Sequence, residues 1–60
     1  MTYYDIILRE WRGEWMPIII EYITGEEDRE EERYRGEYQA TPEQALTRAR
    51  QALDKIKGGE

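Results

Sequence analysis

The chain has no cysteine and no histidine among its 60 residues. A disulfide is therefore impossible, and a structural zinc site built from these two ligand types is excluded. Serine is absent too, so the usual pairs of nucleophile and base cannot be assembled. Because a chain this short buries only about 60% of the surface that its unfolded form exposes, its stability has to come from tight apolar packing or from association with another chain.

The sequence also lacks a long apolar run. The longest one, Met16–Ile20, includes a proline and is far shorter than the ~20 residues that span a membrane. No signal-peptide pattern opens the chain. We therefore expect a soluble, cytoplasmic protein that binds no membrane, is not an enzyme and needs no cofactor or metal ion.

Negative charge is concentrated in one segment. The net charge is −5, and residues 26–32 contain six carboxylates and one arginine. The residues that follow, 33–60, are slightly basic, with six basic and four acidic groups. The acidic character therefore belongs to this segment rather than to the whole molecule.

Two segments rich in aromatic and β-branched residues predict strands over residues 3–11 and 15–23. The residues between them, Arg12 to Glu14, predict a short hairpin loop that contains a glycine. Alternation within each strand then assigns the side chains to two faces. The core face is expected to carry Tyr4, Ile6, Leu8, Met16, Ile18, Ile20 and Tyr22.

The C-terminal half predicts one more strand and a helix. Residues 33–40 alternate in polarity, which indicates a half-buried strand. Thr41 is a favourable N-cap, Pro42 suits the first helical position, and apolar residues at helical spacing predict a helix over residues 42–57. The predicted fold class is α+β: one domain of residues 1–60, a three-stranded antiparallel meander with one C-terminal helix packed on one face (β-β-β-α).

The acidic segment is expected at the tip of the second hairpin, over residues 25–32. A calcium loop needs ligands at alternate positions and a turn glycine between them, and this segment has neither, so we expect no metal site. Two alternatives remain: a solvated turn whose charges keep the tip from pairing with another strand, or a contact with a basic partner. The carboxylates are Glu26, Glu27, Asp28, Glu30, Glu31 and Glu32.

The face of the predicted sheet opposite the core is rich in aromatic and apolar residues. Monomers seldom leave a large apolar patch uncovered, and Trp, Tyr and Arg are enriched at interfaces. This face is therefore predicted to bind a protein partner or a second copy, as a dimer; a contact between Trp11 and Trp15 across the hairpin is the simpler alternative. The predicted partner-binding residues are Tyr3, Ile7, Arg9, Trp11, Trp15, Ile19, Arg33 and Arg35.

The element order and the helix start resemble known families. The segment Thr41–Leu53 is similar to the helix of HicB-type antitoxin domains. Gly13 and Trp15 in the hairpin, with Thr41 and Ala45 at the helix start, resemble the arm-binding domain of tyrosine-type phage integrases. The double-stranded-RNA-binding domain is similar in order, but its first helix and the lysine-rich start of its last helix are missing here.

The integrase resemblance implies DNA binding through the exposed face of the sheet. In this chain, the matching residues would be Arg9, Trp11, Arg33 and Arg35. Neutralisation of phosphate dominates the affinity of such domains, and the net negative charge works against it. Nucleic-acid binding is therefore the alternative hypothesis.

The leading hypothesis is a non-catalytic interaction or regulatory module. A small, acidic, cysteine-free chain also resembles phage-encoded inhibitors such as anti-CRISPR proteins, many of which occupy nucleic-acid-binding surfaces with carboxylates. This resemblance implies that the acidic segment would engage a basic groove, and that association would weaken with salt.

Overall fold

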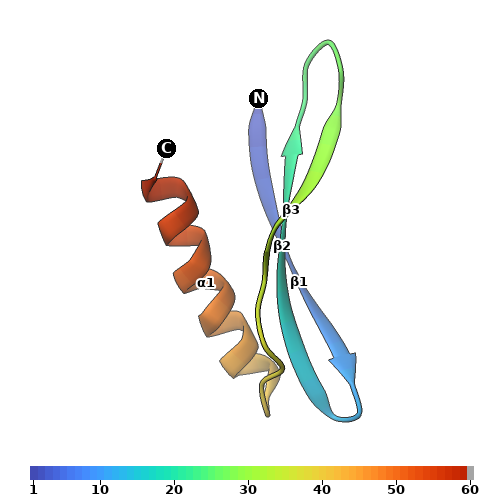
Figure 1. Cartoon of the computed structure of the whole chain (residues 1–60), viewed down its shortest axis with the longest axis vertical. Coiled ribbons are helices and arrows are strands. Elements are labelled where there is room, and N and C mark those ends of the chain that lie inside the picture. The colour runs from blue at the N-terminus through green and yellow to red at the C-terminus, as the bar shows by residue number, and fades with distance from the viewer. Residues whose placement is uncertain (60) are drawn as a thin grey trace.

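A computed structural model describes residues 1–59 of the chain. Within this range it contains three strands, β1 (Thr2–Trp11), β2 (Glu14–Ile23) and β3 (Arg29–Arg35), followed by the helix α1 (Pro42–Gly58). The strands form one antiparallel sheet in the order β1-β2-β3. The predicted α+β class and the β-β-β-α order are confirmed (Figure 1).

The molecule has two layers, the sheet and the helix that lies along one of its faces (Figure 1). Helix α1 packs mainly on the central strand β2 and less on β1. Ala45 and Ala49 are fully buried in this contact, as is Ile19 of β2. Because alanine side chains are short, the helix backbone can lie close to the sheet, and the core stays thin.

Both ends of α1 carry the signals read from the sequence. The Thr41 hydroxyl accepts a hydrogen bond from the Gln44 N–H at 3.1 Å, and Pro42 begins the helix. At the other end, the Gly59 N–H donates to the Lys55 carbonyl at 3.0 Å. Lys55 and Lys57 lie in the last turn, where positive charge interacts favourably with the helix dipole.

The loop between β1 and β2 is shorter than the sequence analysis predicted. Only Arg12 and Gly13 lie outside the strands, and both have positive φ, 51° and 80°. This is the backbone of the type I′ turn that suits a two-residue hairpin. The expected three-residue loop from Arg12 to Glu14 was wrong: Glu14 pairs with Trp11 as the first residue of β2.

This difference of one residue moves the side chains of β2 to opposite faces. Residues paired across an antiparallel ladder share a face, and a register slip of one residue exchanges the faces. Ile6 pairs with Ile19, and Leu8 with Pro17, so the face covered by α1 includes Ile19 rather than Ile18. The expectation that Met16, Ile18, Ile20 and Tyr22 share the face of Tyr4, Ile6 and Leu8 is corrected accordingly.

The third strand also begins earlier than predicted, at Arg29 rather than at residue 33, and it ends at Arg35 rather than at residue 40. A β-bulge opposite Ile19 and Ile20 leaves Arg33 as the additional residue. After the strand, the chain still follows β2, because Gln39 and Trp15 exchange backbone hydrogen bonds of 2.7 and 2.8 Å. The acidic segment is therefore divided between a loop, residues 24–28, and β3 itself.

We expect Gly13→Ala to destabilise the fold by about 1 kcal/mol, because a side chain at a left-handed backbone position is strained. Space is not the cause, since nothing lies within 4 Å of an added Cβ. Gly25→Ala is the matched control: its Cβ also meets nothing, and its φ is not positive. Denaturant unfolding of both variants measures the difference, and equal destabilisation by the two would contradict the turn assignment.

Candidate interaction surface

The face of the sheet that points away from α1 is called the outer face below. Three of its large apolar side chains are strongly exposed: Trp11 at 56%, Tyr3 at 50% and Ile7 at 40%. Within residues 1–59, no helix or strand lies over it (Figure 1). By the observed register, the outer face consists of Tyr3, Asp5, Ile7, Arg9 and Trp11 of β1, Glu14, Met16, Ile18, Ile20 and Tyr22 of β2, and Glu30, Glu32 and Arg35 of β3.

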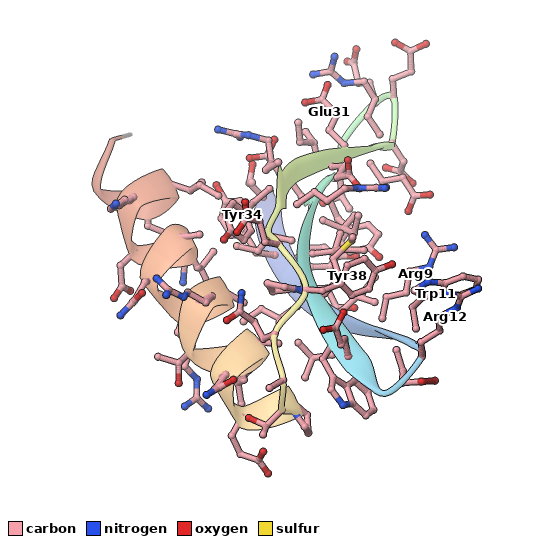
Figure 2. The ribbon with its side chains drawn as sticks, turned by 60° about the horizontal axis from the view of Figure 1, so that its bottom comes forward. Arg9, Trp11, Arg12, Glu31, Tyr34 and Tyr38 are labelled. Carbon is pink, nitrogen blue, oxygen red and sulfur yellow. The ribbon has the colours of Figure 1, made fainter. Side chains whose placement is uncertain are left out.

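Aromatic contacts order this face. Tyr3 stacks on Tyr22 with ring centroids 5.2 Å apart. At the turn, the Arg12 guanidinium lies 5.3 Å from the centre of the Trp11 ring, a cation–π distance. Figure 2 shows Arg9, Trp11 and Arg12 together on the side away from the helix, whereas Tyr34 points toward it. Tyr22 thus contacts the exposed ring of Tyr3 at one end of β1, and Arg12 contacts that of Trp11 at the other end.

The structure brings together some of the predicted partner-binding residues and separates others. Tyr3, Ile7, Arg9 and Trp11 share the outer face of β1, and Arg35 joins them through its pairing with Ile18. Three of the predicted residues do not belong to the outer face: Trp15, Ile19 and Arg33.

Each of these three has a place on the helix side. Ile19 is 0% exposed and belongs to the core. Trp15 pairs with Glu10, so it shares the face of Leu8 and Ile6 rather than that of Trp11. The two indoles therefore point to opposite sides of the sheet, which rules out the alternative of a contact between them across the hairpin.

Arg33 forms an ion pair with Glu21, the most buried charged residue among residues 1–59. The Arg33 guanidinium donates to the Glu21 carboxylate, whose side chain is 6% exposed against 37% for Arg33. Glu21 follows the core residue Ile19 on the same face of β2. Removal of its partner would leave a carboxylate with little water around it, which is costly.

Arg35 is also paired, but near the surface. Its Nε and Nη2 atoms donate to the same oxygen of Glu32, at 3.0 and 2.7 Å. The predicted DNA-binding residues included Arg33 and Arg35. Both are therefore neutralised by carboxylates of the same chain, Glu21 and Glu32. Since phosphate contacts supply most of such affinity, this pairing weakens the physical case for nucleic-acid binding.

The acidic segment does not form one cluster. Loop residues Glu26 and Glu27 are exposed, and the Asp28 carboxylate accepts a hydrogen bond from the Gly25 N–H at 3.2 Å. Glu30, Glu31 and Glu32 lie in β3, where successive side chains alternate between faces. Among residues 1–59, no group of three or more acidic side chains is arranged to hold a metal ion.

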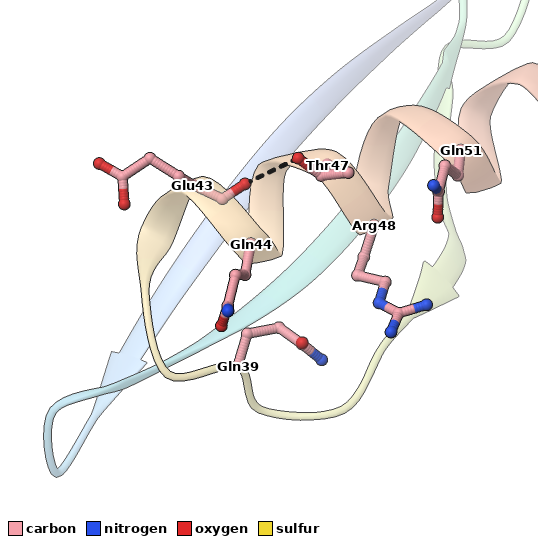
Figure 3. Close-up of a pocket in the computed structure, with 6 residues that line it drawn as sticks. All are labelled: Gln39, Glu43, Gln44, Thr47, Arg48 and Gln51. Carbon is pink, nitrogen blue, oxygen red and sulfur yellow. Dashed lines mark hydrogen bonds between the residues drawn. The ribbon is translucent and has the colours of Figure 1, made fainter.

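A hollow of about 470 Å³ lies beside the first turns of α1 (Figure 3). Thr47 bonds back to the Glu43 carbonyl at 3.0 Å, and the other lining groups reach toward solvent. The lining has one carboxylate and one guanidinium, and both of these side chains are exposed. The hollow is lined by Gln39, Glu43, Gln44, Thr47, Arg48 and Gln51.

Sequence reasoning missed Tyr22, Met16 and Tyr38 as members of the surface. The first two were assigned to the core because of the register error. Tyr38 follows β3 and is 38% exposed. Its neighbour Gln39 pairs with Trp15 of the helix face. Because successive side chains alternate, Tyr38 lies on the opposite side. Figure 2 agrees with this placement. Strict alternation through Gly36 would put Tyr38 on the same face as Tyr34, so nothing in the sequence signalled this placement.

Fold and surface together define a small α+β domain with an open, partly aromatic sheet face. No family model matches the chain, and no curated protein or solved structure matches it either. Among residues 1–59, no helix combines the length and the apolar character needed to cross a membrane.

The two ion pairs at Arg33 and Arg35 predict different losses of stability. Arg33→Ala should destabilise by about 2 kcal/mol, because Glu21 stays buried without its partner while part of the site remains open to water. Arg35→Ala removes a pair exposed by 52% and 41% and should change stability by less than about 1 kcal/mol. Denaturant unfolding of both variants compares them, and a larger loss for Arg35→Ala would contradict the assignment.

Tyr22 predicts a loss of stability in alkali. Burial raises the pKa of Tyr22 above its usual 10.0, and the charges of Glu30 and Asp5 raise it further. The folded state thus favours the neutral phenol. The contribution of Tyr22 to the free energy of unfolding is therefore present below pH ~10 and is lost as the pH rises through the pKa of the folded state. Tyr22→Phe should show a shallower fall in unfolding free energy above pH ~10 than the wild type, and an unchanged slope would contradict this.

Proposed function

We propose that the protein is a non-catalytic interaction module that binds a protein partner through the outer face. The observation that carries this proposal is the set of exposed side chains on a sheet face that no described helix or strand covers: Trp11, Tyr3, Ile7 and, from the segment after β3, Tyr38. Ile18, in the middle strand of this face, is only 6% exposed. Soluble domains usually cover such a face with a second layer. A partner would supply the layer that α1 supplies on the other side.

The molecule's shape supports the proposal. The Cα atoms span 40 × 22 × 13 Å, so the domain is long and thin. It exposes 4614 Å², where a typical monomer of its mass exposes roughly 4,200 Å². The excess agrees with an open sheet that a partner would close.

The chemistry of the outer face describes the partner. Arg9 and Asp5 lie among apolar side chains, and Glu32 and Arg35 neutralise each other on β3. A matching surface would have an apolar centre with charges of both signs at its border, rather than a run of phosphates. We also propose that this chain acts in the cytoplasm. It has no cysteine, so it gains no disulfide from an oxidising compartment.

The β-β-β-α order also supports a regulatory role like that of HicB-type antitoxin domains, to which the helix start is similar. An inhibitor that works through its acidic segment is less well supported, because Glu30, Glu31 and Glu32 are divided between the two faces of β3. The aromatic rings, rather than the carboxylates, are the proposed anchors.

The test uses two variants that change the outer face without touching the core. Trp11→Ser and Tyr38→Ser remove exposed rings, so each should weaken partner binding by about 2 kcal/mol, or roughly thirtyfold, if that ring is an anchor. The wild-type chain is immobilised to capture partners from the cells that produce it and from a display library, and affinities are then measured for every chain.

Arg50→Ser is the matched control, because Arg50 is exposed on α1. A protein retained by the wild type and by Arg50→Ser, and lost by both ring variants while they stay folded, supports the proposal. If every captured protein binds the ring variants as tightly as the wild type, the outer face is not the interface.

A further inference from the structure

The outward edge of β1 has backbone hydrogen-bonding groups that pair with no described strand. Met1 and Thr24 exchange two backbone hydrogen bonds, both 2.8 Å. Because such pairs alternate along an antiparallel ladder, the odd-numbered residues of β1 bond to β2. The even-numbered ones, Ile6 and Leu8 among them, direct N–H and C=O groups away from β2, where no described strand lies.

This edge carries the charges of Asp5, Arg9 and Glu10 but lacks the bulge and the proline that often protect an edge strand from pairing. Strand β1 is ten residues long, contains no proline, and pairs with β2 in one continuous register. Native proteins normally shield such an edge with a bulge, a proline or a covering segment. The other edge of the sheet, β3, has the bulge at Arg33 and three consecutive glutamates.

The sequence of β1 is complementary to itself when it is reversed. If a second copy lies antiparallel with the two Ile7 residues opposite each other, Asp5 faces Arg9 of the second copy, and Arg9 faces its Asp5. Tyr3 then faces Trp11 of the second copy, and on the helix side Ile6 faces its Leu8. Opposite charges and aromatic pairs across strands each stabilise a sheet by about 0.2–1 kcal/mol.

The charges distinguish this alignment from its neighbours. A two-fold alignment centred on Asp5 or on Arg9 sets like charges against each other, which is unfavourable. One centred on Ile6 puts Asp5 opposite Ile7, and one centred on Leu8 puts Asp5 opposite Trp11. The alignment centred on Ile7 is the one that pairs Asp5 with Arg9.

Neither charged residue has an ion-pair partner within the described chain. The salt bridges of residues 1–59 involve other side chains. On their own sheet, Asp5 lies opposite Ile20 and Arg9 opposite Met16, so each charge has an apolar neighbour across the strand. Both side chains are exposed and available to a second copy.

We propose that two copies of the chain pair through β1, antiparallel and centred on Ile7, to form a continuous six-stranded sheet. There is room for this arrangement. The two β2 strands would lie about 14 Å apart, which accommodates two helices of about 10–12 Å diameter side by side over the sheet. The half-buried Ile6 and Leu8 side chains would gain neighbours between the helices.

The pairing would also enlarge the outer face. Three strands of this length give a flat face of roughly 500 Å², less than the ~800 Å² that each partner of a standard interface buries. Two sheets side by side give roughly 1,000 Å². The dimer depends on the edge of β1 and shares Trp11 with the proposed partner surface, so Tyr38→Ser is the ring variant that separates the two proposals.

The decisive test is an exchange of charges, read by sedimentation equilibrium of the pure protein. The wild type should have the mass of two chains. Asp5→Arg and Arg9→Asp, each alone, should weaken the dimer by about tenfold or more, since each sets like charges opposite each other twice. An equimolar mixture of the two variants, and the double variant D5R/R9D, should both recover wild-type association.

Asp54→Arg and Arg50→Asp on exposed positions of α1 change the net charge equally and should leave the dimer unchanged. Circular dichroism confirms that every chain stays folded. A wild type that has the mass of one chain throughout, single variants that remain dimeric, or a mixture without recovery would each overturn the proposal. None of these results depends on partner capture, and Tyr38→Ser, which lies away from β1, should remain dimeric even if it loses a partner.

A cysteine at the two-fold axis checks the alignment independently. Ile7 would form a non-hydrogen-bonded pair with its copy, with Cα atoms about 4.5 Å apart, which is within reach of a disulfide. With an added oxidant, Ile7→Cys should form a covalent dimer, whereas Tyr3→Cys should not, because the two copies of residue 3 would lie about 27 Å apart. Equal cross-linking by both variants would overturn the alignment.

Discussion

The positive φ angles of Arg12 and Gly13 decide which side chains this protein buries. A two-residue turn sets the register of β1 against β2, and the register sets the faces. It places Ile19 in the core and keeps Trp11 outside. The helix contact, the buried ion pair and the aromatic outer face all depend on this turn, because one more residue in it would exchange the faces of β2.

Most of the fold could be predicted from local chemistry, because its signals lie close together in the chain. Thr41 and Pro42 mark the helix start, and the spacing of Ala45 and Ala49 marks its buried stripe. The faces of β1 were also predicted correctly. The length of the first loop was not, because Arg-Gly is a weaker type I′ signal than Asn-Gly, and Glu14 reads equally well as loop or strand. From that error followed the misplacement of Trp15, Ile19 and Tyr22.

The pair of Glu21 and Arg33 shows another limit of the sequence. The predicted register would put Glu21 on the face opposite the core, but the chain buries its carboxylate at the edge of the core. The partner comes from a bulge in β3, and a bulge depends on how two strands meet rather than on either strand alone. Arg33 therefore turns toward the helix, although simple alternation would put it beside Arg35. An arginine predicted to meet a ligand instead anchors the third strand.

The bulge in β3 has a consequence for the size of any assembly. A sheet with two equal, open edges can add copies without limit and grow into a fibril. Here one edge is kinked at Arg33, and Glu30, which forms no ion pair among the described residues, repels an approaching copy. Growth through β1 would therefore stop at a closed pair, since the far edges on both sides are of the repelling kind.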